Sequence, residues 1–69
     1  MKKLSARNQL KGKIVEVKKG ATTSHVQIDI GNGIVISSAI TIVAVADLYL
    51  KSGVEAWAVI KASDVMIGV

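Results

Sequence analysis

The sequence predicts an all-β fold, a small five-stranded barrel of the OB type with one short helix between strands 3 and 4. The apolar residues are mostly Val, Ile, Ala and Leu, and they alternate with polar residues in short runs, as in strands that are buried on one face. Glycine-rich or polar segments separate these runs. The 69 residues are expected to form a single domain over residues 1–69. Three strands, a helix and two further strands suit an OB barrel.

The first strand is predicted over residues 9–19. Its apolar residues begin on one parity with Leu10 and Ile14 and continue on the other with Val15 and Val17. A change of parity within one run indicates an extra residue in the strand, so we expect a β-bulge in a strongly bent strand.

The second and third strands are predicted to form a hairpin. Gly20 ends the first strand and residues 21–24 form a polar turn. Residues 25–30 alternate strictly between polar and apolar, which is typical of a half-buried strand. The Gly-Asn-Gly sequence at residues 31–33 favours a tight turn, because Gly and Asn tolerate positive φ. Residues 34–38 form the return strand.

The segment over residues 39–50 carries two conflicting signals. Its β-branched residues favour a strand. Thr41, however, is a suitable N-cap, and Val45 and Leu48 have helical spacing. We predict a short helix over residues 42–48.

The last part of the chain is predicted to hold two strands, residues 54–61 and 65–69, with a turn at residues 51–53 before them. Trp57 and Val59 make the second face of the first of these strands apolar as well. A sheet that is apolar on both faces needs cover on both sides. A partner subunit is the simplest cover, so we expect self-association.

The net charge of +4 comes from nine basic and five acidic residues. It suits anionic partners, from nucleic acid to small oxyanions, but on charge alone solubility is the better explanation. The basic start Met1-Lys2-Lys3 is not followed by the apolar run of a signal peptide. The uncharged stretch over residues 30–46 is too short and too polar for a spanning helix. We therefore expect a cytoplasmic protein that contacts no membrane.

Catalysis is not supported by the side chains present. The chain has no Cys, one His and no pair of acids at a motif spacing, so a triad or a zinc site cannot be assembled. His25 has no evident orienting acid and fits a surface position. The only aromatic residues that could stack on bases are Tyr49 and Trp57, and the lysines are scattered. The predicted protein is not an enzyme, and a nucleic-acid-binding OB module remains the alternative.

Two short segments are rich in hydrogen-bond donors and contain no acid. Ser5-Ala6-Arg7-Asn8 precedes the first strand, and Lys61-Ala62-Ser63 lies where the fourth strand breaks. A fully ionised tetrahedral dianion requires only donors, and these segments supply a guanidinium, an ammonium, hydroxyls and backbone amides. The same residues also fit a structural role, in which Ser63 caps a turn and Ser5 frays with the N-terminus.

The chain resembles the molbindins, the Mop-type molybdate-binding domains. Residues 5–14, Ser-Ala-Arg-Asn-Gln-Leu-Lys-Gly-Lys-Ile, look like the opening signature of this family, and residues 60–66, Ile-Lys-Ala-Ser-Asp-Val-Met, look like its closing signature. The Ile40-Thr41 pair and residues 50–53 also match. The resemblance covers nearly the whole chain and corresponds in length to a molbindin of one domain.

The resemblance implies binding of molybdate, and of tungstate, between the subunits of a homohexamer built as a trimer of dimers. It assigns the anion to Ser5, Ala6 and Arg7 together with Lys61, Ala62 and Ser63, and it implies that Thr41 reaches in from a neighbouring chain. It also implies a second anion site, lined here by Gly20, Ala21, Thr22 and His25. No side chain is implied to bind a metal ion directly.

The sequence departs from the family at one place near the expected site. Many relatives have a Ser shortly after the Ile-Thr pair, where this chain has Val43-Ala44. Two roles fit the implied site, storage of the oxyanion and a regulatory sensor whose occupancy controls a partner protein.

Overall fold

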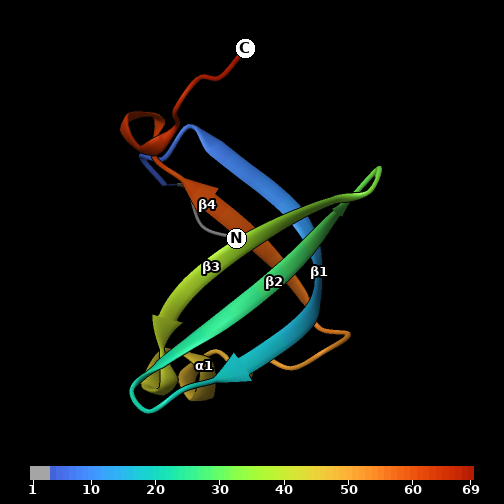
Figure 1. The fold of residues 1–69 in the computed structure, drawn as a ribbon, viewed down its shortest axis with the longest axis vertical. Coiled ribbons are helices and arrows are strands. Elements are labelled where there is room, and N and C mark those ends of the chain that lie inside the picture. Colours follow the sequence, from blue (N-terminus) through green and yellow to red (C-terminus); the bar gives the residue numbers. More distant parts are fainter. Residues whose placement is uncertain (1–3) are drawn as a thin grey trace.

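The computed structural model describes residues 4–69, so the basic start Met1-Lys2-Lys3 lies outside it. Four antiparallel strands form one strongly curled sheet in the order β3-β2-β1-β4 (Figure 1). In chain order the elements are β1 Asn8–Lys19, β2 Thr23–Gly31, β3 Ile34–Thr41, α1 Ile42–Asp47, β4 Glu55–Ile60 and the short 3-10 helix η1 Ala62–Asp64. Among the described residues, no helix is long and apolar enough to cross a membrane.

β1 curls the sheet because it pairs with a different neighbour along each half. Residues 8–13 pair with β4, and residues 13–19 pair with β2. The register with β2 shifts between Ile14 and Glu16, which confirms the predicted bulge. The side chain of Ile14 is buried while that of Val15 is exposed, so the extra residue turns outward and Val17 returns to the inner face.

The predicted hairpin between β2 and β3 is confirmed. Asn32 and Gly33 both have positive φ, 55° and 74°, as a two-residue type I′ turn requires. The Asp29 carboxylate accepts a hydrogen bond of 2.8 Å from the amide of Gly31. β3 is longer than predicted, because its last residues pair with Thr23 and Ser24, which the polar composition had assigned to a turn.

The short helix α1 forms where it was predicted. The Thr41 hydroxyl accepts a hydrogen bond of 3.1 Å from the amide of Ala44, which caps the first turn. Val45 is buried and packs onto the sheet. The helix ends at Leu48, and the next residue, Tyr49, has a φ of 54°. A left-handed conformation costs a residue with a side chain about 1–2 kcal/mol.

The core is small, because one curled sheet and one helical turn enclose little volume. Its buried apolar members are Ile14, Val26, Ile28, Val45 and Ala58. The hydroxyl of Ser24 is fully buried beside them, with no hydrogen-bond partner in residues 4–69. A core of this size gives a single chain marginal stability.

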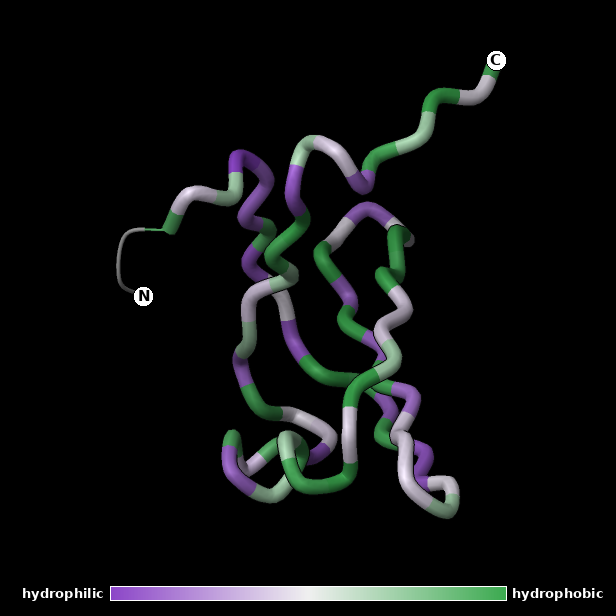
Figure 2. Tube along the Cα trace, turned by 90° about the vertical axis from the view of Figure 1, so that its left-hand side faces the viewer, coloured by the Kyte–Doolittle hydropathy of each residue, from purple (hydrophilic) through white to green (hydrophobic). Residues whose placement is uncertain are grey.

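The prediction of a fifth strand over residues 65–69 is wrong for the single chain. These residues form no ladder, all of them are exposed, and the segment runs away from the sheet (Figures 1 and 2). The sheet therefore has four strands and stays open between β3 and β4, so it is a curled half-barrel and the five-stranded closed barrel is not confirmed. Alternating apolar residues define the faces of a strand, but a strand also requires a neighbour to bond with, and this segment has none within the described chain.

The tight approach of β1 and β2 at Gly12 can be tested by substitution. A Cβ at this position would lie 2.5 Å from the Asp29 carbonyl oxygen and 2.7 Å from Ile28 Cγ2. Because backbone atoms cannot yield, we expect Gly12→Ala to lower the free energy of unfolding by about 1–3 kcal/mol, as overpacking does. Gly68→Ala is the matched control, since nothing lies within 4 Å of its Cβ. Thermal melting at one fixed protein concentration measures both, and equal melting temperatures would contradict this packing.

Candidate functional site

The structure brings the two donor-rich segments together at one end of the sheet. Asn8 and Ile60 are partners in the β1–β4 ladder, and the Asn8 side-chain amide also donates a hydrogen bond of 3.2 Å to the Ile60 carbonyl. Arg7 is the residue before Asn8 and Lys61 is the residue after Ile60, so the two cationic residues leave the ladder side by side. Figure 1 shows the start of β1 next to η1 at this end.

The turn that follows β4 supplies amides as well as a cation. Lys61 caps η1 with an extended backbone, and its carbonyl accepts a hydrogen bond of 2.9 Å from the amide of Asp64. The first amides of a helical turn have no partner within that turn, and here they belong to Ala62 and Ser63. A negatively charged ligand could therefore meet an ammonium, a hydroxyl and free amides within three consecutive residues.

The N-terminal segment is held against the same corner. The Gln9 side-chain amide donates a hydrogen bond of 3.1 Å to the Ala6 carbonyl, which fixes the backbone beside Arg7. Ser5, Arg7 and Lys61 are all exposed. Exposed charges interact weakly because water screens them, so this corner of an isolated chain is a weak anion site that would gain from being covered.

Thr41 does not join this corner in the single chain. It ends β3 and caps α1, and it pairs with Thr23 at the start of β2. Figure 1 places α1 at the end of the molecule opposite to η1. Within one chain the structure therefore separates Thr41 from Arg7 and Lys61.

The residues implied for a second site lie at the α1 end. Gly20, Ala21 and Thr22 form the turn between β1 and β2, and the Thr22 carbonyl accepts a hydrogen bond of 3.1 Å from the amide of Ile42. Thr22 is thus a neighbour of Thr41. His25 is exposed further along β2, where it pairs with Lys18 and Ala39, so it stands apart from this turn.

The sequence did not single out Asn8 as the residue that joins the two segments. Its backbone pairing and its side-chain hydrogen bond both reach Ile60, so it fixes where Lys61 emerges relative to Arg7. An amide side chain at the end of the first donor-rich segment is the only local sign of this role. Its partner lies 52 residues away, and local sequence carries no information about that pairing.

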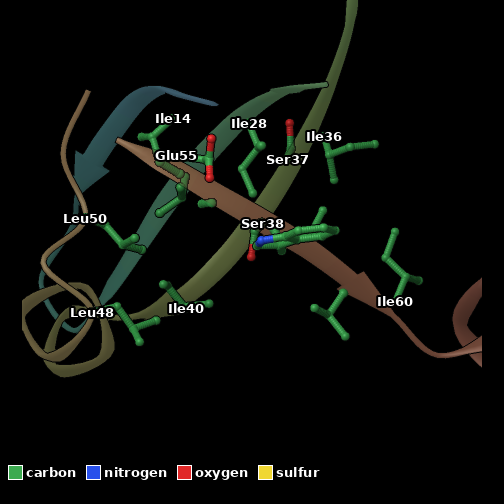
Figure 3. A pocket seen from close by; sticks show the side chains of 15 residues that line it. Ile14, Ile28, Ile36, Ser37, Ser38, Ile40, Leu48, Leu50, Glu55 and Ile60 are labelled. Atoms are coloured by element: carbon green, nitrogen blue, oxygen red, sulfur yellow. The ribbon is translucent and has the colours of Figure 1, made fainter. Parts of the chain in front are cut away.

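A separate groove opens between β3 and β4, where the sheet does not close (Figure 3). Its volume is about 690 Å³, and apolar side chains form most of its wall. Glu55 is the only charged residue of its lining, so the groove is unsuited to a dianion. Within residues 4–69 no three His, Cys, Asp or Glu side chains gather into a metal-binding group. The corner with Arg7 and Lys61 is therefore the candidate site.

Comparison with known proteins identifies the family. Residues 4–67 match the model of the TOBE domain. The chain belongs to the TOBE domain family. It is 54% identical over 67 residues to a probable molybdenum-pterin-binding protein of Haemophilus influenzae, and the match covers 97% of each chain. The resemblance to Mop-type proteins is thereby confirmed.

Solved structures support the fold. MopII of Clostridium pasteurianum superposes with a TM-score of 0.90 at 48% identity, covering 97% of this chain and 100% of MopII. The cytoplasmic molybdate-binding protein ModG, solved with molybdate bound, superposes with a TM-score of 0.95 at 46% identity. The match covers 99% of this chain and 48% of ModG.

The structural role of Thr41 can be separated from any role in binding. We expect Thr41→Ala to lower the free energy of unfolding by about 1 kcal/mol, because the helix loses its cap. Thr41→Ser keeps the hydroxyl that bonds Ala44 and should retain most of the stability. Chemical denaturation of both variants measures the difference, and identical stability of the Ala variant and the parent would show that the cap is unimportant.

Proposed function

We propose that this protein binds molybdate as an intact oxyanion at a site formed by Ser5, Ala6, Arg7, Lys61, Ala62 and Ser63. The observation that carries the proposal is the pairing of Asn8 with Ile60, which puts the two donor-rich segments next to each other. The relatives described as molybdate-binding or molybdenum-pterin-binding support the choice of ligand.

Each group has a distinct task in this proposal. Arg7 and Lys61 offset the two negative charges of the anion. The hydroxyls of Ser5 and Ser63 and the amides of Ala62 and Ser63 donate hydrogen bonds that fix its orientation, and donors are all that a fully ionised tetrahedral anion requires. Tungstate has the same shape and charge, so we propose that it binds as well.

We propose further that the site is completed between subunits. Thr41 lies at the opposite end of the chain, so its hydroxyl can join Arg7 and Lys61 only from a second copy. The open apolar groove and the exposed apolar residues after η1 support assembly, because both leave apolar surface that a single chain does not cover. Figure 2 shows the largely hydrophobic segment after η1 running away from the rest of the chain. A homohexamer arranged as a trimer of dimers is the proposed assembly.

Cytoplasmic storage of molybdate is the proposed role, with Gly20, Ala21, Thr22 and His25 as a second and weaker anion site. A regulatory sensor would use the same site, and a protein partner captured only when molybdate is present would favour it. A nucleic-acid-binding module would instead bind single strands in a salt-dependent way and would not respond to molybdate.

Removing one cation tests the site directly. We expect Lys61→Ala to weaken molybdate binding by about 3–5 kcal/mol, as the loss of one partner does in a buried ion pair. Lys51→Ala is the matched control, because it removes the same charge from an exposed turn before β4. Titration calorimetry with molybdate alone measures both. Equal affinity of the Lys61 variant and the parent would exclude Lys61 from the site.

Assembly is the second test of the proposal. Sedimentation equilibrium is expected to give a species well above the chain mass of 7.2 kDa, with six copies as the proposed end point. The physical reason is the apolar surface left open by the four-stranded sheet. A folded monomer at micromolar concentration would refute an intersubunit site.

A further inference from the structure

The backbone carbonyls that precede the two cationic residues of the candidate site are each held by a side-chain amide. The Ala6 carbonyl accepts a hydrogen bond of 3.1 Å from the side chain of Gln9. The Ile60 carbonyl accepts one of 3.2 Å from the side chain of Asn8. Two adjacent amide residues at the start of β1 therefore occupy one carbonyl at each donor-rich segment.

These hydrogen bonds also set the direction of the next backbone amides. In a trans peptide the N–H points opposite to the C=O, so holding the Ala6 carbonyl toward Gln9 turns the Arg7 amide to the other side. The Ile60 carbonyl is held toward β1, which turns the Lys61 amide away from that strand. Neither amide donates a hydrogen bond to an acceptor in the described part of the chain. Both amides are therefore available to a ligand.

The carbonyls of the turn after β4 are occupied as well. The Lys61 carbonyl accepts a hydrogen bond of 2.9 Å from the amide of Asp64, and the Ala62 carbonyl accepts one of 3.3 Å from the amide of Val65. The four carbonyls that already accept a hydrogen bond at this corner are those of Ala6, Ile60, Lys61 and Ala62. The backbone here thus presents donors, while these acceptors are turned to the chain itself.

An excess of donors over acceptors separates two classes of tetrahedral anion. Molybdate, tungstate and sulfate carry no proton at neutral pH, so all of their oxygens accept hydrogen bonds. Phosphate carries one or two protons at that pH, and each P–O–H group needs an acceptor. A hydroxyl that enters a covered site without an acceptor loses the hydrogen bond that it made to water. A site whose nearest carbonyls are occupied is therefore unfavourable to phosphate.

We propose that Asn8 and Gln9 are positioning residues that make the anion site selective for fully ionised oxyanions over phosphate. The proposal rests on the proposed function, because it names a source of specificity for the same site. Each side chain keeps one carbonyl away from the anion and presents the amide that follows that carbonyl. The side chain of Asn8 thus has a chemical role in addition to joining the two segments.

A neutral amide is the side chain best suited to this task. It donates to a carbonyl and brings no charge to the corner. A carboxylate at residue 8 or 9 could not donate to the carbonyl and would repel the anion. A lysine at either position could donate, but it would add a third cation beside Arg7 and Lys61.

Competition between anions tests the proposal. Titration calorimetry at neutral pH and one ionic strength measures the binding of molybdate alone, in the presence of phosphate and in the presence of sulfate. The parent should bind molybdate roughly tenfold or more tightly than phosphate. We expect Asn8→Ala and Gln9→Ala each to lower this ratio roughly two- to tenfold, the change in affinity that one hydrogen bond gives. The ratio of molybdate to sulfate affinity should stay at the parent value, because sulfate has no proton to donate.

Gln27→Ala is the matched control. Gln27 is a half-buried amide residue of β2 that pairs with Glu16 and Ser37, away from the corner. This variant should keep both affinity ratios of the parent. Circular dichroism checks that every variant is folded. Partial unfolding would weaken the binding of all the anions by the same factor, so it would leave both ratios unchanged.

The outcomes distinguish the roles of Asn8 and Gln9 from the proposed function. If the parent binds molybdate and the two variants keep its ratio of molybdate to phosphate affinity, the positioning roles are overturned and the proposed function stands. Equal shifts of the phosphate and sulfate ratios would also overturn these roles, since they indicate a loosened site and not a freed acceptor. A parent that binds no molybdate would overturn both proposals.

Discussion

The molecule depends on the double pairing of β1. This strand is long enough to serve two neighbours, and it does so by bonding β4 with its first half and β2 with its second. The bulge after Ile14 lets the strand bend between the two pairings without exposing the inner face. The same bend sends the first residues of the strand to the end of β4, so the position of Arg7 relative to Lys61 is a direct consequence of how the sheet curls.

Electrostatics explains why the proposed anion site at this corner would gain from a second chain. Two cations at an exposed corner repel each other only weakly, because water screens them, and for the same reason they attract an anion only weakly. Covering the corner lowers the local dielectric constant, which strengthens each hydrogen bond to the anion and also raises the cost of leaving the cations unpaired. An assembled corner without its anion is thus less favourable than one that holds it, which couples occupancy to the contact between copies.

Local signals in the sequence predicted the elements whose hydrogen bonds are local. The Asn32-Gly33 turn and the Thr41 cap each rest on residues within a few positions of one another, and both are confirmed. The strand expected over residues 65–69 does not form in the single chain. An alternating apolar pattern identifies the faces of a strand but does not specify which strand will pair with it. Thr23 and Ser24 were assigned to a turn on composition, yet pairing with the end of β3 draws them into the sheet. The role of Asn8 in joining the two donor-rich segments could not be predicted for the same reason, since its partner Ile60 is distant in sequence.

The separation of Thr41 from Arg7 and Lys61 restricts how copies can be arranged. Each chain offers a cationic corner at one end and the Thr41 hydroxyl at the other, so the proposed site would take one end from each of two copies. In a two-fold pair lying antiparallel, each copy completes the site of the other, and no end is left unused. A head-to-tail ring gives the same balance, whereas an open chain of copies leaves one corner without its hydroxyl. Closed assemblies therefore hold one complete site for every chain.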